Sequence, residues 1–150
     1  MKIIHLINSL KKGGAEGNLY RLCKFQKNKY KKKIDIIIIT LIDNGHYETE
    51  LKKAGIKIFS LGLGKKNKLF DFIKKILKLR KFINKQNPNA VQSWMYHSNF
   101  VTLFFPKIFY KKVFWNIRHS ELNFKISKKT TILVSIICGI FSKVVPKKII

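Results

Sequence analysis

Apolar and polar positions along the chain alternate between two kinds of segment. Short β-branched or aromatic runs predict strands at 2–8, 34–42, 56–61, 90–94 and 113–117. Longer stretches with apolar residues at helical spacing predict helices at 16–31, 48–54, 68–86, 97–110 and 128–145. The unbroken isoleucine run 36–39 is typical of a strand that helices cover on both faces. The alternation predicts an α/β fold with one doubly wound parallel sheet.

The last helical stretch and the chain end need separate comment. Residues 130–145 are apolar and flanked by lysines, but the uninterrupted part is about a dozen residues, where a membrane span needs roughly 20. We therefore expect a buried or surface-docked helix that Pro146 stops. Residues 147–150 look like the start of a further strand, so we expect the chain to be C-terminally incomplete.

Composition adds a strong charge. The chain has 32 Lys and Arg against 7 Asp and Glu, a formal net charge of +25. The lysines are spread along the whole chain, and only Arg21, Arg80 and Arg118 are arginines, which counts against a nucleic-acid-binding domain. The basic stretches 68–86 and 24–33 suit an anionic membrane surface, and equally a solvated lysine face.

The number of cysteines indicates the redox environment in which the protein works. Cys23 and Cys138 cannot form a disulfide scaffold, which fits a reducing environment. We expect a cytoplasmic protein, at the inner face of the membrane if the basic surface contacts lipid. No cysteine or histidine cluster has metal-ligand spacing, so no metal site is expected.

The first predicted strand leads into a glycine-rich turn, Asn8-Ser9-Leu10-Lys11-Lys12-Gly13-Gly14-Ala15-Glu16. Gly13 and Gly14 allow the backbone to approach a ligand, and the following helix start attracts phosphate. The spacing matches neither the dinucleotide fingerprint nor a P-loop. Phosphate binding and a plain tight turn both remain open here.

Three segments together resemble one family. IIHLINSLKKGGAEGNLYRLCK resembles the opening of family 4 glycosyltransferases, in which a strand leads into GGAE and a helix. The segment 93–99, SWMYHSN, is similar to the part of that family after the fourth strand. The segment 115–120, WNIRHS, is similar to its strand ending in IRHS. Their order and spacing extend the resemblance over essentially all 150 residues.

The resemblance implies a Rossmann-like domain, the N-terminal, acceptor-side half of a GT-B enzyme. Such a hexosyltransferase is retaining and metal-independent, needs no cofactor beyond the nucleotide-sugar co-substrate, and serves polysaccharide or glycolipid synthesis. Its acceptor is a glycan or a lipid-linked molecule. The family's E-x7-E donor motif is absent, and the last glutamate is Glu121. We therefore expect residues 1–150 to lack the donor-binding domain and to be inactive alone.

The resemblance also singles out side chains. His119 follows a predicted strand end and would orient the acceptor or stabilise charge as the sugar leaves its diphosphate, or would be a loop histidine that is hydrogen-bonded to backbone. Arg118 would pair with phosphate or form a surface salt bridge, and His97 would contact acceptor or cap a helix. Glu16 would complement the helix dipole or contact the acceptor. His5 is expected in the core and His46 in an inert turn.

Two other classes of function remain open: a non-catalytic module that binds a phosphate-bearing ligand or a partner, and a basic nucleic-acid-binding domain. For each of these functions, the predicted topology also predicts where the candidate site residues lie in space. Gly13, Gly14, His97, Arg118 and His119 each follow the carboxyl end of a parallel strand. Such ends share one edge of the sheet, so these residues should converge there.

Overall fold

The computed structural model describes residues 1–43, 45–64, 69–117 and 129–150. In chain order, the strands are β1 (Lys2–Ile7), β2 (Asp35–Thr40), β3 (Lys57–Ser60), β4 (Ala90–Trp94), β5 (Val113–Asn116) and β6 (Lys148–Ile149). The α-helices are α1 (Gly14–Tyr30), α2 (Glu48–Lys53), α3 (Leu69–Gln86), α4 (Met95–Thr102) and α5 (Lys129–Phe141). Two 3-10 helices, η1 (Lys31–Lys33) and η2 (Lys107–Lys112), complete the order.

Within the described residues the strands form one six-stranded sheet in the order β3-β2-β1-β4-β5-β6. Every neighbouring pair is parallel, and the central strand β1 pairs with β2 and β4 along nearly its whole length. The five strands expected from the sequence are confirmed within two residues, and the suspected strand at the chain end is β6. The Rossmann-like α/β fold is thereby confirmed.

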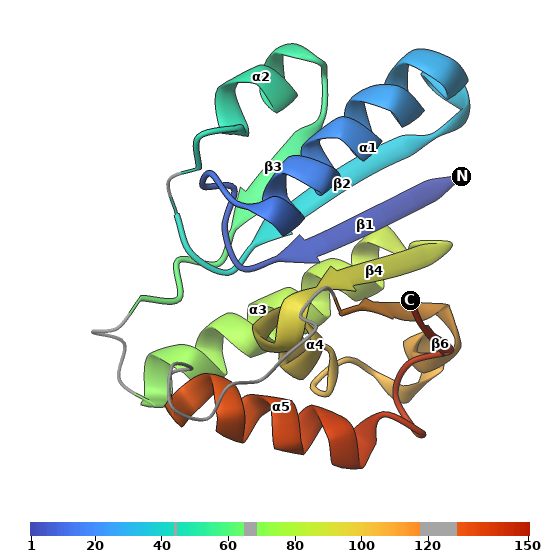
Figure 1. Cartoon of the computed structure of the whole chain (residues 1–150). Coiled ribbons are helices and arrows are strands. Elements are labelled where there is room, and N and C mark those ends of the chain that lie inside the picture. The colour runs from blue at the N-terminus through green and yellow to red at the C-terminus, as the bar shows by residue number, and fades with distance from the viewer. Residues whose placement is uncertain (44, 65–68, 118–128) are drawn as a thin grey trace.

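Helices cover both faces of this sheet (Figure 1). On one face α1 and α2 bury Leu19, Cys23 and Leu51 against the strands. On the other face α3, α4 and α5 bury a larger cluster around Leu79 and Trp115. The four isoleucines of β2 are at most 1% exposed, because side chains from successive positions enter opposite layers. This double burial is the reason the strand is apolar without alternation.

The two cysteines lie in different layers. Cys23 of α1 is buried with the first layer, and Cys138 of α5 with the second. Burial raises the pKa of the Cys23 thiol to about 12 and that of Cys138 to about 11. Both side chains therefore stay protonated at neutral pH and pack as small apolar groups.

Two predicted helix ends were wrong. The helix expected at 97–110 begins at Met95 and ends at Thr102, and η2 forms a separate turn after Pro106. Proline lacks the amide hydrogen that a continuing helix needs. The last helix ends at Phe141 and not at Pro146, because Ser142 turns back onto the Gly139 carbonyl through its amide and its hydroxyl.

The apolar face of α3 is also shorter than its sequence pattern suggests. Ile76, Leu79 and Ile83 are buried, whereas Leu69 is 76% and Ile73 47% exposed. The first turns of this helix therefore carry apolar side chains that the described part of the fold does not cover.

Candidate functional site

The strand order places a topological switch point between β1 and β4. The chain runs from β1 outward to β2 and β3, and then crosses back through α3 to β4. Figure 1 shows the ends of β1 and β4 side by side, and Ile7 is in register with Trp94. The chain leaves β1 toward α1 and leaves β4 toward α4, on the opposite face of the sheet. Doubly wound sheets bind their ligands outside such an edge.

The turn after β1 forms one side of this edge. Gly13 caps α1 in an extended conformation, and no side-chain hydrogen bond caps the helix. Instead the Glu16 carboxylate folds back over Gly13, where a Cβ would collide with it. Nothing lies within 4 Å of a Cβ built on Gly14, so that position faces open space. A carboxylate at the third helical position complements the partial positive charge of the helix start.

The turn is held by the neighbouring loop after β2. The Asn8 carbonyl accepts from the amides of Leu41 and Ile42, and the Leu10 carbonyl accepts from Tyr47 at 3.0 Å. Gly45 packs so closely on Leu10 that a Cβ there would lie 2.8 Å from the Leu10 backbone. This close approach requires glycine, and it fixes the loop that presents Gly13 and Gly14.

On the other side of the switch point, β4 runs into α4 without an intervening loop. The reversal occurs at Met95, whose φ of 69° lies in the left-handed region that favours glycine. His97 is the third residue of α4 and is half-buried. His97 therefore lies in the first turn of the helix that follows β4, the strand adjacent to the one that leads into Gly13.

A buried polar network anchors α4. The Ser93 hydroxyl donates to Asn99 Oδ1 at 2.6 Å, and Thr102 Oγ1 donates to the Asn99 carbonyl at 2.6 Å. Trp115 Nε1 in turn donates to Thr102 Oγ1 at 2.9 Å. The segment 93–99 that resembles the family motif is thus partly structural, because Asn99 is fully buried and ties α4 to β4 and β5.

His5 lies beneath the same edge, inside β1, and is fully buried as expected from the sequence. Trp94 Nε1 donates to His5 Nδ1 at 3.4 Å, which places the proton of the neutral ring on Nε2. Burial lowers the His5 pKa to about 4, and the nearby Gln26 side chain opposes this effect in part. His5 is therefore neutral at physiological pH and supports the strand as a core residue.

The remaining predicted site residues are distributed unevenly. Arg118 and His119 lie outside the described residues, although the strand they follow, β5, ends at Asn116 in register with Trp94. A cavity of about 420 Å³ opens between α4, the end of β5, β6 and helix α5, with Tyr96 and Ile117 in its lining. His46 is exposed in the turn that follows β2. Within the described ranges no group of three acidic, cysteine or histidine side chains could hold a metal ion.

Sequence reasoning missed two features of this edge. The dependence of the β1 turn on Gly45 was not visible, because that contact joins loops more than 30 residues apart in sequence. The left-handed Met95 was also missed, although the abrupt change from strand to helix pattern around Trp94 was a usable signal. The polar residues Ser93, Asn99 and Thr102 in otherwise apolar segments could have indicated the buried network.

Solved structures share this fold. HepE from Anabaena in complex with UDP superposes with a TM-score of 0.62 and 15% identity, over 93% of this chain and 35% of HepE. HepE in complex with UDP and glucose gives 0.61 and 16% over the same shares. MurG from Acinetobacter baumannii gives 0.59 and 12%, over 99% of this chain and 40% of MurG. The chain has the Rossmann-like fold found in GT-B glycosyltransferases.

No protein-family model and no curated protein matches the sequence. Membership of family 4 therefore rests on the three sequence segments and stays a prediction. The chain spans 35–40% of the length of these solved structures, so their whole activities do not transfer to it directly. None of the helices in the described ranges combines the length and the apolar character needed to cross a bilayer.

Proposed function

We propose that residues 1–150 form the acceptor-side domain of a glycosyltransferase similar to family 4. The enzyme would move a sugar from a nucleotide-sugar to a glycan or lipid-linked acceptor, and transfer would need a separate donor-binding domain. The observation that carries the proposal is the position of the GGAE turn and of His97, at the ends of the adjacent strands β1 and β4. The similarity of the fold to HepE, solved with UDP, supports it.

Each residue of the edge has a role in this proposal. Ligand phosphate would meet the backbone at Gly13 and Gly14 and the start of α1. The Glu16 carboxylate would accept hydrogen bonds from acceptor hydroxyls, and His97 would contact the acceptor from α4. Arg118 and His119, outside the described residues, would pair with phosphate and stabilise the charge that develops on the leaving diphosphate.

Inorganic pyrophosphate tests the phosphate role on the purified chain. Binding should shift the amide resonances of Gly13, Gly14 and His97, and Gly14→Val should remove these shifts by blocking close approach. Glu16→Gln should tighten binding about twofold to fivefold, because it removes a negative charge from the helix start while keeping the side-chain shape. The control is Gly64→Val, since a Cβ at Gly64 also meets nothing within 4 Å.

Two results would contradict this assignment. Shifts confined to the lysine-rich segment 29–33 would show that pyrophosphate follows net charge and not the turn. Unchanged or weaker binding by Glu16→Gln would show that pyrophosphate does not bind at the helix start beside this carboxylate.

The exposed surface of helix α5 favours a second partner, an anionic membrane surface. Its outward stripe, Leu133, Ile136 and Ile140, is 53–70% exposed, while Ser135 and Cys138 face the core, and Val144 just after the helix is 65% exposed. The helix carries no acidic residue, and Lys129 and Lys143 flank the stripe. Such a helix would bury its apolar face in the lipid boundary while the lysines meet phosphate. The exposed Leu69 and Phe70 at the start of α3 are in keeping with this.

Vesicle co-sedimentation checks the membrane proposal. The chain should bind phosphatidylglycerol vesicles, should bind phosphatidylcholine poorly, and should detach as salt is raised. The double variant Leu133→Ser with Ile140→Ser should lower partitioning at least about tenfold through lost apolar burial. Ile108→Ser is the control, because Ile108 is 76% exposed on η2, outside α5 and outside both basic stretches. Equal loss in both variants would refute a role for α5.

A further inference from the structure

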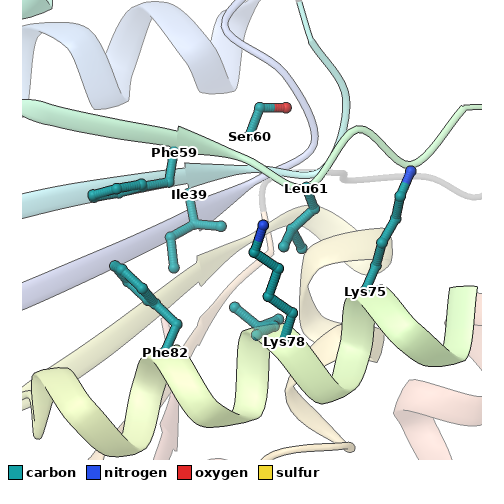
Figure 2. Close-up of a pocket in the computed structure, with 8 residues that line it drawn as sticks. Ile39, Phe59, Ser60, Leu61, Lys75, Lys78 and Phe82 are labelled. Carbon is teal, nitrogen blue, oxygen red and sulfur yellow. The ribbon is translucent and has the colours of Figure 1, made fainter.

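A second cavity lies away from the switch point, between the edge strand β3 and helix α3. Its volume is about 200 Å³. The lining consists of Ile39, Phe59, Ser60, Leu61, Lys75, Lys78, Leu79 and Phe82 (Figure 2). In the described part of the chain no strand pairs with the outer edge of β3. The cavity is therefore open to solvent at the edge of the sheet.

One half of this cavity is apolar. Phe59 of β3 and Phe82 of α3 face each other with ring centroids 4.7 Å apart and tilted planes. Phe59 is 43% exposed, which is high for an aromatic side chain that has an apolar cavity beside it. Ile39 and Leu79 are buried and belong to the main core, so this half continues the core to the surface.

The other half carries the ammonium groups of two lysines, and only one of them has a partner among the described residues. Lys75 Nζ donates to the Gly62 carbonyl, and Asp43 Oδ2 approaches the same glycine. Gly62 has a φ of +59°, so this loop conformation is one that glycine favours. Lys78 is different: among the described residues no group forms a hydrogen bond or ion pair with its ammonium. Figure 2 shows its side chain extending between Ile39 and Leu61 toward the strand end.

Ser60 adds a hydrogen-bond donor at that end. Its Oγ accepts from the Gly62 amide at 3.2 Å, which leaves the hydroxyl hydrogen available to a ligand. The exposed ammonium group of Lys78, which has no partner among the described residues, and the exposed Ser60 hydroxyl thus border an apolar cavity of defined size. This combination is complementary to a molecule with one anionic group and one compact apolar body.

We propose that this cavity binds a small anionic amphiphile, an aliphatic carboxylate whose apolar body has about eight carbon atoms. The size follows because a benzene-sized body occupies a cavity of about 150 Å³. The carboxylate would meet Lys78 and the Ser60 hydroxyl, and the alkyl chain would lie against the paired rings of Phe59 and Phe82. Its lining includes none of the residues proposed to act at the switch point, so the site is independent of the proposed glycosyltransferase function.

Octanoate is the probe for this site, with octanol and acetate as controls that lack the charge or the apolar body. In an isotope-labelled sample of the full chain, octanoate should shift the methyl resonances of Ile39, Leu61 and Leu79, and acetate should not. Calorimetry should show that Lys78→Met weakens octanoate binding about fivefold to tenfold and changes octanol binding less than twofold. Lys81→Met, an exposed lysine one turn further along α3 and outside the lining, should change neither.

A second variant separates the two halves of the cavity. Phe59→Ala should weaken octanoate and octanol to a similar extent, because both lose the same aromatic contact. Equal effects of Lys78→Met and Lys81→Met would overturn the proposal, since they would show that octanoate responds only to net charge. Methyl shifts at α5 in place of the cavity residues would overturn it as well.

Discussion

Gly45→Ala should lower the free energy of unfolding by about 2–3 kcal/mol. A Cβ at this position would meet the Leu10 backbone, which cannot yield without moving the turn that carries Gly13 and Gly14. Urea unfolding followed by far-UV circular dichroism measures the change. The matched control is Gly139→Ala in α5, where a Cβ meets nothing within 4 Å. That variant should be stabilised by about 0.5–1 kcal/mol through higher helix propensity. If Gly45→Ala is as stable as the unchanged chain, the loops after β1 and β2 do not pack as closely as the contact between Gly45 and Leu10 requires.

The second large effect concerns acid stability. The pKa of His5 is about 4 in the folded chain and close to 6.5 in the unfolded one, so the unfolded state binds the proton more readily. Keeping His5 neutral therefore contributes to the stability of the folded chain. This contribution is fully present above pH 6.5 and is lost as the pH falls toward 4. Over this range His5 alone should remove about 3 kcal/mol of unfolding free energy.

Two histidine variants isolate this contribution. His5→Gln should be less stable than the natural sequence at pH 7, because a buried packing group is replaced. Its stability should nevertheless change less between pH 6.5 and 4, since the titrating group is gone. His46→Gln, at an exposed turn, should keep the full pH dependence. An unchanged slope in His5→Gln would mean that other groups control the acid transition.

The extent to which the sequence anticipated the fold differs between strands and helix ends. The strands were placed closely because a strand covered on both faces leaves an unbroken apolar run, as at 36–39. The ends of α4 and α5 were missed because they depend on local competition: Pro106 removes an amide hydrogen, and Ser142 bonds to Gly139. Neither of these effects changes the spacing of the apolar residues, so the apolar pattern could not predict where the two helices end.

The candidate site shows the same division. Strand ends predict which loops meet at the switch point, and in the structure Gly13 and Gly14 follow β1 while His97 follows the adjacent strand β4. The position of the Glu16 carboxylate over Gly13 and the burial of Asn99 could not be predicted, because both depend on side-chain packing. The same is true of the cavity beside β3, whose shape depends on how α3 crosses the sheet.

The two buried cysteines have a practical consequence. Each thiol is shielded and protonated at neutral pH, and each lies under a different helical layer, Cys23 beneath α1 and Cys138 beneath α5. A thiol-reactive reagent can modify Cys23 only after α1 has separated from the sheet. Cys138 is 2% exposed but belongs to the lining of the cavity beside α5, so a reagent small enough to enter that cavity should reach it first. Peptide mapping of the modified chain would therefore distinguish access through the cavity from opening of the α1 layer.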